Sequence, residues 1–568
     1  MTATPASTEA TAASAAIDAL VDGGVTTLYC NPGTTELPFI RELTARQVPR
    51  YVLTLHEGAA VSGAAGHALA TGRPGVAVVH AMPGAANALN MIYNVSRSHV
   101  PLVLIIGVQD LRHQFLDPML QADVPGVLRP IAKRVWEAQT GEALGEVISL
   151  ALRDAIAQPS GPVVVCVPLD IWDTPGGVAT TNAVSALPRF GAAPVDQVEQ
   201  LADQLVAADA PTLIVGDLAA QRQAGATIAS LAAAAAATVR WAPACSLAGS
   251  LSQSPYHRGP IFPDARSFAR AFEDTDMVLG IGAEVLPPTL FQGRELFPAT
   301  LACATLNEVP EDDVGILRPQ LSVYGDLPTT IEALDRAVRA RATADPACER
   351  RLGARREALR LEYESERARL HERSRPREGE AGPMPARVAV ALGLEAAPAG
   401  TVVVDEAVSN SGWVSLLGRF EDALSYVTMA RGGGLGYALG VALGVQIASS
   451  RPVLTFVGDG ALVYGPQALW TIAHENLPIV TCVLNNSSYE ILKGFMRNHF
   501  VDASPTPEDA AEWRLDISAP ALDTVALARS FGVASARVED AASLREAVAN
   551  AFASGKPWLI DVAIAGGP

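Results

Sequence analysis

The chain has 568 residues, which is too long for one hydrophobic core and favours about three domains of ordinary size. Apolar residues make up 49% of the sequence and charged residues 18%, as is typical of a well-buried globular protein. The formal net charge is -18 and no basic tract stands out, so the composition argues against a nucleic-acid partner.

The six cysteines are scattered and form no CxxC pair, which argues against zinc sites and disulfide frameworks and favours a reducing compartment. The first residues lack the basic region and the long apolar run of a signal peptide. No apolar run reaches 18 residues, so we expect no membrane span. These features together predict a cytoplasmic protein.

Residues 1–180 alternate between strand-like and helix-like patterns. The apolar runs of strand length are "TTLYC", "YVLTL", "GVAVVH", "PLVLIIG" and "GPVVVCVP", and helical segments such as "GAANALNMIYNVSRSH" separate them. Unbroken apolar strands between helices indicate a parallel sheet that is covered on both faces. This part of the chain therefore predicts a first α/β domain.

The rest of the chain repeats that style twice. A Gly-, Pro- and Thr-rich stretch around residues 174–195 predicts a linker, and residues 191–340 carry the strand patterns "PTLIVGDL", "TVRWAP" and "DMVLGIGAEV". Residues 341–383 are dense in charge and predict a solvated helix with a connector. Residues 384–568 carry "TVVVDE", "PVLTFVGD", "PIVTCVLNN" and "WLIDVAI". The predicted fold is α/β, with three open, mostly parallel, doubly wound domains.

Two polar motifs follow neighbouring strand patterns of the third unit. Asp459 follows "VLTFV" within Gly-Asp-Gly, and Asn486 ends "PIVTCVLNN" 27 positions later. Ligands of open parallel sheets bind beyond the carboxyl ends of strands, where carboxylate and amide oxygens suit magnesium or calcium. Gly458 and Gly460 let backbone amides approach a phosphate. The pair predicts a metal-bound diphosphate, with two unrelated turns as the alternative.

Two further stretches contain candidate ligand-binding residues: one carries an acid, and the other is rich in glycine. Glu57, in "LTLHEGAAVSG", lies at a strand-to-helix junction, where it could share a proton with a ligand nitrogen or simply favour the helix N-terminus. In "RGGGLGYALGVALG" the glycines surround one bulky residue, Leu435. The spacing of these glycines is not that of a dinucleotide fingerprint, and no GxxxxGK[ST] loop is present.

Together these motifs resemble the thiamine-diphosphate-dependent decarboxylase and acetolactate-synthase-like superfamily, whose metal motif is Gly-Asp-Gly, a spacer and Asn-Asn. The resemblance covers nearly the whole chain in the family's order of pyrimidine-binding, middle and diphosphate-binding domains. It is strongest to the benzoylformate-decarboxylase branch, through "NPGTTELPFI", "GGGLGYAL" and "NNSSYEILKGF". Thiamine diphosphate and Mg²⁺ are the cofactors that it implies.

The resemblance also implies roles for individual residues. It implies that Asp459, Asn486 and the Ser488 carbonyl bind magnesium, and that Leu435 bends the cofactor. It implies that Glu57 of a partner subunit bonds to the pyrimidine ring, so that the functional unit is a homodimer or homotetramer with sites at the subunit interface. The remaining cofactor contacts expected are Gly433, Gly460, Ala461, Ser409, Tyr489 and Ile491.

The proton-transfer residues depart from the branch pattern. His80 matches the first histidine of the branch, and Thr34 stands where its active-site serine would be. The second histidine is absent, with Thr289 at the aligned place. Glu490 is a further acid/base candidate near the metal motif, with a position away from the substrate as the alternative. Leu492 replaces the glutamate of pyruvate-decarboxylase-like enzymes, and no His-His pair is present, so that branch is disfavoured.

The sequence therefore predicts an enzyme that decarboxylates a 2-oxo acid, with acids that carry a bulky or aromatic side chain as the favoured class. An acetolactate-synthase-like carboligase that joins an acyl unit to an aldehyde or second oxo acid is the main alternative. A binding protein that keeps the cofactor fold without turnover is a third hypothesis, against which the retention of Glu57, Asp459 and Asn486 argues.

Overall fold

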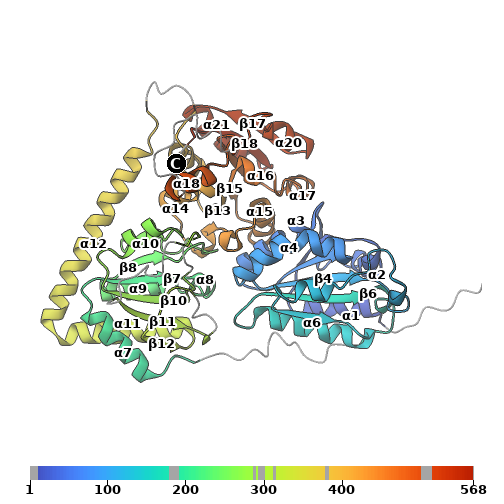
Figure 1. Cartoon of the computed structure of the whole chain (residues 1–568), viewed down its shortest axis with the longest axis horizontal. Coiled ribbons are helices and arrows are strands. Elements are labelled where there is room, and N and C mark those ends of the chain that lie inside the picture. Colours follow the sequence, from blue (N-terminus) through green and yellow to red (C-terminus); the bar gives the residue numbers. More distant parts are fainter. Residues whose placement is uncertain are drawn as a thin grey trace, which may run out of the picture.

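The computed structural model describes residues 10–177, 191–285, 289–291, 301–310, 315–377, 383–499 and 514–566. These residues form three α/β domains, each built on a six-stranded sheet (Figure 1). All pairings between the named strands are parallel. The predicted α/β class with three open parallel sheets is confirmed. Residues 178–190, most of the linker predicted around residues 174–195, lie outside the described residues.

The N-terminal sheet has the strand order β2-β1-β3-β4-β6-β5. Its strands are β1 (Thr27–Asn31), β2 (Arg50–Leu53), β3 (Gly75–His80), β4 (Leu102–Val108), β5 (Arg134–Glu137) and β6 (Pro162–Pro168). Its helices are α1 (Ala12–Asp22), α2 (Leu37–Thr44), α3 (Glu57–Thr71), α4 (Ala81–Arg97), α5 (Val124–Leu128) and α6 (Gly141–Ile156). Successive residues of β4 enter two different apolar clusters, because Val103 packs with α1 and α6 while Leu104 packs with α3 and α4. Helices therefore cover both faces of this sheet.

The middle sheet has the order β12-β11-β10-β7-β8-β9. Its strands are β7 (Pro211–Val215), β8 (Thr238–Trp241), β9 (His257–Pro260), β10 (Met277–Ile281), β11 (Ala302–Asn307) and β12 (Leu321–Tyr324). Its helices are α7 (Val195–Ala207), α8 (Asp217–Gln221), α9 (Gly225–Ala235), α10 (Ala265–Phe272) and α11 (Leu327–Ala344).

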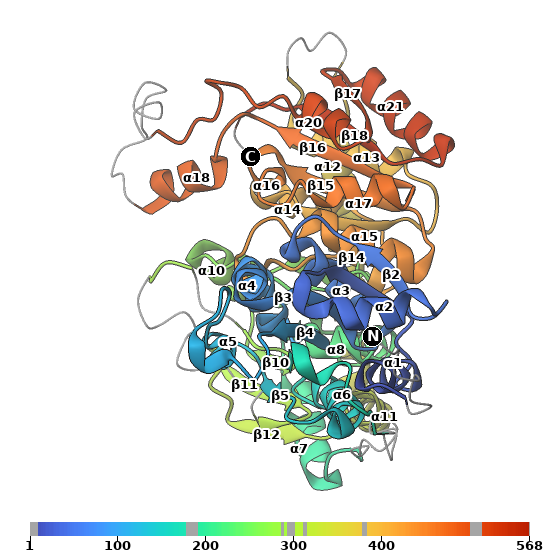
Figure 2. The same cartoon turned by 90° about the vertical axis from the view of Figure 1, so that its right-hand side faces the viewer.

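The C-terminal sheet has the order β14-β13-β15-β16-β18-β17, which matches the N-terminal sheet strand for strand. Its strands are β13 (Val402–Glu406), β14 (Tyr426–Val427), β15 (Val453–Gly458), β16 (Ile479–Asn485), β17 (Ala534–Val538) and β18 (Trp558–Ala563). Its helices are α13 (Ala386–Ala396), α14 (Ser411–Leu417), α15 (Ala438–Ser449), α16 (Asp459–Leu462), α17 (Ala468–His474), α18 (Glu490–His499), α20 (Thr524–Ser530) and α21 (Ala541–Ser554). Figure 2 shows α18 projecting beyond the sheet of its own domain.

The charge-dense stretch forms one long helix, α12 (Pro346–Arg373), which runs along the edge of the molecule from the middle domain to the C-terminal domain (Figure 1). Asp345 caps its N-terminus by accepting a hydrogen bond from the amide of Ala347 at 2.8 Å. Only Cys348 and Leu352 of this helix are buried, so most of its length is solvated.

Helices α3 and α15 join the N-terminal and C-terminal domains through a close crossing of small residues. A Cβ atom added to Gly444 would lie 1.9 Å from the carbonyl oxygen of Gly63, and one added to Gly440 would lie 1.8 Å from Oγ of Ser62. Only glycine permits this approach, because the obstructing atoms at Gly444 belong to the backbone of the other helix.

A buried ionic network joins all three domains. Arg431 of the C-terminal domain bonds to Asp217 at 3.2 Å and to Glu284 at 2.5 Å, both in the middle domain. Glu284 also pairs with Arg97 of the N-terminal domain at 3.1 Å. Burial raises the pKa of Glu284, but His99, Arg431 and Arg97 outweigh it and hold that pKa at about 2. Arg431 directly precedes the glycine-rich segment, so the network anchors that segment.

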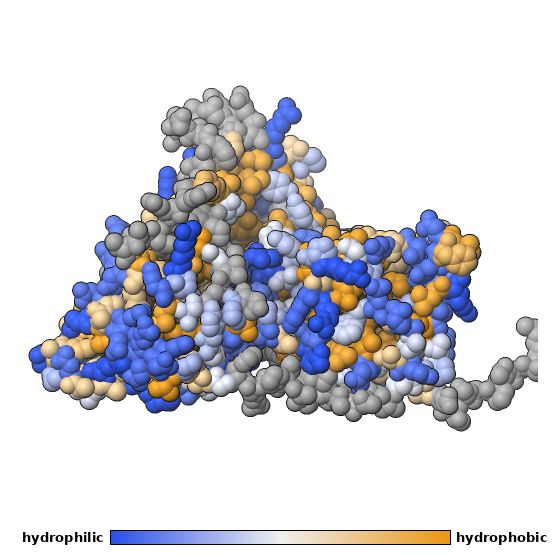
Figure 3. All heavy atoms as spheres, turned by 60° about the horizontal axis from the view of Figure 1, so that its bottom comes forward, coloured by the Kyte–Doolittle hydropathy of each residue, from blue (hydrophilic) through white to orange (hydrophobic). Residues whose placement is uncertain are grey.

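Among the described residues, no helix is both long and apolar enough to cross a lipid bilayer. Hydrophilic and hydrophobic residues are mixed over the face of the molecule shown in Figure 3.

Candidate active site

The two predicted metal-binding side chains follow adjacent strands. Asp459 follows β15 and Asn486 follows β16, and these strands pair in parallel with Gly458 opposite Leu484. One carboxylate oxygen of Asp459 accepts from the amide of Ser487 at 2.6 Å, and the other accepts from Gly460 at 2.8 Å. The structure thus brings both motifs to one edge of the C-terminal sheet.

The predicted ligand set consists of oxygen atoms. Oδ1 of Asn486 accepts from the amide of Ser488 at 3.1 Å, which holds the loop that presents the Ser488 carbonyl. The part of the chain that the structure describes contains no cluster of three His, Cys, Asp or Glu side chains that could hold a metal. The predicted site would not be found by that criterion, because Asp459 is its only His, Cys, Asp or Glu side chain. Its other donors are an amide oxygen and a backbone carbonyl, and such oxygen donors suit a hard cation such as Mg²⁺.

The predicted diphosphate-binding residues surround the start of α16. Gly460 and Ala461 are buried there, and the side chain of Tyr489 lies against Gly460. A Cβ atom on Gly460 would lie 2.6 Å from the Tyr489 ring, so a larger residue at this position would have to displace that ring. Burial is the largest cause that raises the pKa of the Tyr489 hydroxyl, with smaller contributions from Tyr464 and Asp459. Ser409 lies at the carboxyl end of β13, in the 3₁₀ turn Val408–Asn410.

The glycine-rich segment is held in place by the N-terminal domain of the same chain. Asn94 donates to the carbonyl of Gly434 at 2.8 Å and accepts from its amide at 3.0 Å, while Asn90 donates to the carbonyl of Leu435 at 3.0 Å. Gly433 has a φ of +74°, and nothing lies within 4 Å of where its Cβ atom would be. The Gly433 position therefore faces open space, as a cofactor contact requires.

Glu406 supports the next turn of this segment. Its carboxylate accepts from the amides of Gly436 at 2.5 Å and Ala438 at 2.8 Å. Burial raises the pKa of Glu406 to about 8, against the opposing effect of these amides. The sequence analysis did not identify Glu406, although it ends the strand "TVVVDE" at the predicted ligand-binding edge.

Glu57 begins α3 and is buried, with 8% of its surface exposed. Nδ2 of Asn87 donates to its carboxylate at 3.1 Å. Asn87, Asn90 and Asn94 therefore form one face of α4, from which the first binds Glu57 and the other two bind the glycine-rich segment. The sequence analysis missed these asparagines, although their i, i+3, i+7 spacing within "NALNMIYN" was a signal.

His80 ends β3 and bonds to a buried acid. Nδ1 of the imidazole lies 3.0 Å from Oε2 of Glu36 and 2.9 Å from Oγ1 of Thr35. The hydrogen bond with Glu36 is the largest cause that raises the pKa of His80, burial opposes it, and the charges of Glu36 and Glu57 add to it. Thr35 makes the hydroxyl contact to His80, and the candidate Thr34, which is exposed, precedes it by one residue.

The remaining candidates lie on α18 and in the middle domain. Glu490 is buried and forms an ion pair with Arg497 on the same helix. Ile491 and Leu492 are exposed by 37% and 46%. Thr289 is exposed, and its amide donates to the carbonyl of Pro263 at 2.9 Å.

Two family descriptions match the two domains that carry these residues. Residues 10–124 match "Thiamine pyrophosphate enzyme, N-terminal TPP binding domain", and residues 406–562 match "Thiamine pyrophosphate enzyme, C-terminal TPP binding domain". A putative acetolactate synthase large subunit of Mycobacterium tuberculosis is 30% identical over 564 residues, which cover 97% of this chain and 98% of the relative. The chain belongs to the thiamine-diphosphate-dependent enzyme family, as the sequence predicted.

Within that family the chain is similar to aromatic 2-oxo acid decarboxylases. A benzoylformate decarboxylase of Pseudomonas aeruginosa is 29% identical over 556 residues, covering 97% of this chain and 98% of the relative. The solved structure of a thiamine diphosphate-dependent 4-hydroxybenzoylformate decarboxylase from Rhodococcus jostii RHA1 superposes with a TM-score of 0.82 at 27% identity. That likeness covers 98% of this chain and 100% of the other. The chain is thus an enzyme, a 2-oxo acid decarboxylase or a related thiamine-diphosphate enzyme.

Proposed function

We propose that the protein is a Mg²⁺-dependent 2-oxo acid decarboxylase whose substrates resemble benzoylformate. The observation that carries this proposal is the pairing of His80 with the buried Glu36, which provides a proton donor in the domain that carries Glu57. Decarboxylation leaves a carbanion that must be protonated before product can leave, and an imidazole with a raised pKa is suited to that step. The decarboxylases among the relatives support the same conclusion.

The residues at the sheet edge fit thiamine diphosphate with a divalent ion. Asp459, Asn486 and the Ser488 carbonyl would hold Mg²⁺, and Gly460, Ala461 and Ser409 would hold the diphosphate. When bound, thiamine diphosphate supplies a carbon nucleophile and an electron sink for cleaving the bond beside a 2-oxo group. Open space at Gly433 and the oxygen donor set at Asp459 are the structural features that support this fit.

The chain's own residues then bind, orient and exchange protons. Glu57 would hold a proton against the pyrimidine ring, with Asn87 fixing the direction of its carboxylate. The Gly433 carbonyl would accept from the amino group of that ring, and Leu435 would support its bent shape. Tyr489 and Ile491 would line the cofactor from the other side.

His80 would deliver a proton to the substrate carbon, and Glu36 would keep the imidazole charged. Thr34, which is exposed near the His80–Glu36 pair, would contact the substrate. Glu490 is held by Arg497, so we propose that it sets the polarity of the site rather than transferring protons.

An acetolactate-synthase-like carboligase is the second candidate function. The relative from Mycobacterium tuberculosis favours it, as does Thr289 at the place of the second histidine expected in the decarboxylase branch. With one proton donor fewer, protonation of the nucleophilic carbon left by decarboxylation would be slower, and that carbon could instead attack the carbonyl of an aldehyde or a second oxo acid.

We further infer a homodimer or homotetramer that works in the cytoplasm on small molecules. All six cysteines are buried and free, which supports a reducing compartment.

One screen tests the proposed function. Purified enzyme with thiamine diphosphate and Mg²⁺ is incubated with benzoylformate, 4-hydroxybenzoylformate and branched 2-oxo acids, with and without an added aldehyde, while carbon dioxide and products are measured. We expect carbon dioxide and the free aldehyde without any added acceptor, and we expect Glu57→Gln to remove most of this turnover. Coupled products that form only when an acceptor is added would favour the carboligase, and no carbon dioxide from any acid would contradict the proposal.

A further inference from the structure

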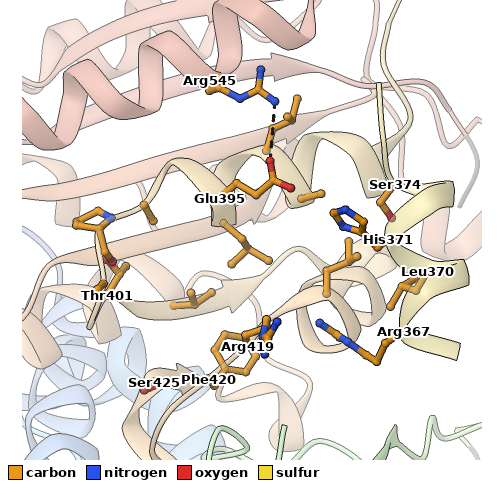
Figure 4. Close-up of a pocket in the computed structure, with 18 of the residues that line it drawn as sticks. Arg367, Leu370, His371, Ser374, Glu395, Thr401, Arg419, Phe420, Ser425 and Arg545 are labelled. Carbon is orange, nitrogen blue, oxygen red and sulfur yellow. Dashed lines mark hydrogen bonds and ion pairs between the residues drawn. The ribbon is translucent and has the colours of Figure 1, made fainter. Parts of the chain in front are cut away.

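A large cavity lies away from the candidate active site, between the end of α12 and the C-terminal domain (Figure 4). Its volume is about 880 Å³, within the range of small-molecule sites. Its walls come from the last turns of α12, from α13, from the amino end of β13 and from the loop after α14. The candidate active site lies at the opposite, carboxyl end of β13.

The cavity is positively charged in a chain that is strongly acidic overall. Four arginines and two glutamates line it, which leaves a formal charge of +2, whereas the whole chain carries -18. At one edge of the cavity, Arg545 lies 3.8 Å from Glu395, a contact drawn in Figure 4. Arg367 and Arg419 lie on the opposite wall (Figure 4), while Arg375 pairs with Glu372 at 3.3 Å.

Arg367 and Arg419 extend toward each other across that wall (Figure 4). Within the described residues, neither guanidinium has a carboxylate at ion-pairing distance, and the one hydrogen bond of Arg367 goes to the carbonyl of Leu416 at 2.5 Å. Burial lowers the pKa of Arg367, and the like charge of Arg419 lowers it further. Two unneutralised guanidinium groups therefore face one space.

Ser374 provides a second, independent sign of a ligand. It follows the last residue of α12, lines the cavity and is only 4% exposed. Its hydroxyl has no hydrogen-bond partner within the described structure. A buried hydroxyl without a partner costs free energy, and a bound acceptor would remove that cost.

We propose that this cavity binds a small molecule that carries a carboxylate or phosphate group on an apolar body. Arg367 and Arg419 hold the anionic group, and Ser374 donates to it. Leu370, Leu392 and Phe420 line the space that the apolar body fills. The ligand touches both α12 and the C-terminal domain, so its binding stabilises the contact between them.

One helix connects the cavity to the loop around Ser409. Helix α14 begins beside Ser409, in the loop proposed to hold the diphosphate, and ends at Leu417 on the cavity wall. The proposal does not depend on the proposed substrate of the enzyme, because none of the candidate active-site residues lines the cavity.

Calorimetry on the holoenzyme tests the site. Phenyl phosphate and benzoate are titrated as the two anionic probes, with benzamide as the neutral control. We expect one site per chain for at least one anion and no comparable heat for benzamide. Tighter binding of phenyl phosphate would assign the site to phosphate esters, and tighter binding of benzoate would assign it to carboxylates.

Variants decide whether the heat comes from this cavity. Arg419→Ala should weaken binding at least tenfold because it removes a charge-assisted contact, Arg419→Glu should abolish it, and Ser374→Ala should weaken it severalfold. Arg369→Ala is the matched control, since Arg369 is exposed on the same helix and does not line the cavity. Absence of heat with both anions up to millimolar concentration, or heat that Arg419→Ala and Ser374→Ala leave unchanged, would overturn the proposal.

Discussion

The imidazole of His80 is influenced by two acids of its own domain. Glu36 bonds to it directly, and the charge of Glu57 acts on it from further away. Both favour the protonated form, so His80 keeps its proton to a higher pH than a free histidine does. If protonated His80 is the acid of the reaction, activity is present below its pKa and is lost as the pH rises through it.

Replacing Glu36 tests this arrangement. Glu36→Gln keeps the shape of the side chain but removes its charge, so the alkaline limb of the profile of kcat/KM against pH should move to lower pH. His80→Ala should lower kcat by about a hundredfold, the lower end of the usual effect of a general acid. Thr35→Val is the control, because it removes the hydroxyl contact and keeps the charge. An alkaline limb that stays in place in Glu36→Gln would show that Glu36 does not set the protonation of His80.

At the scale of single residues, the sequence predicts best where position along a strand decides the chemistry. Asp459 and Asn486 follow apolar strands, and parallel sheets place such residues at one edge. Glu36 was missed because its role depends on a contact with His80 across 44 positions, which no local pattern encodes. Thr34 and Thr35 are adjacent and alike in chemistry, so only the fold could decide which hydroxyl faces His80.

The crossing of α3 and α15 is the element-scale feature that fixes the N-terminal and C-terminal domains of one chain against each other. Helix α3 begins at the candidate residue Glu57, and α15 begins just after the glycine-rich segment. Small residues on both helices permit the approach, and Gly444 faces the backbone of Gly63. A larger side chain must separate the helices and shift both of these ends.

Gly444→Ala should therefore lower the free energy of unfolding by about 2 kcal/mol, as overpacking in a core does. It should also weaken thiamine diphosphate binding, because the displaced α15 shifts the glycine-rich segment that precedes it. Gly494→Ala on α18 is the control, since a Cβ atom there meets nothing within 4 Å and alanine favours a helix. Thermal and denaturant unfolding measure the difference, and equal stability of the two variants would contradict the importance of this crossing.

At the element scale, central strands were predicted from the sequence more often than edge strands. All central strands except β11 were predicted, most of them from unbroken apolar runs. Five of the six edge strands in the described sheets were missed, and their sequences include "RVWE" in β5 and "ASARV" in β17. The missed strands β5, β9 and β17 are partly exposed and contain arginine, so their apolar pattern is weak, and β14 has only two residues. β11 is central but rich in small residues, and it was missed for that reason.

At the scale of the whole molecule, the first and third domains share one strand order and face each other through α3 and α15. The resemblance predicts that the Glu57 of one chain serves the Asp459 of another. The contacts from Asn90 and Asn94 to the glycine-rich segment lie within one chain. Which chain supplies Glu57 to each site therefore needs a direct test.

Complementation between two inactive variants provides that test. Glu57→Gln and Asp459→Ala chains are co-expressed and co-purified. If each site combines residues of two chains, a mixed dimer has one site with both residues intact, and random assortment restores about a quarter of wild-type activity. If each site lies within one chain, every site keeps one lesion and the mixture stays inactive.

The central claim is that one thiamine diphosphate is held through a divalent ion at Asp459 and an acid at Glu57. Titration calorimetry of the cofactor into the metal-free protein, with and without Mg²⁺, tests this claim most directly. The account predicts one cofactor per chain only when Mg²⁺ is present, loss of that heat in Asp459→Ala, and retained binding without turnover in Glu57→Gln. Cofactor binding by Asp459→Ala with the affinity and Mg²⁺ dependence of the wild type would contradict it.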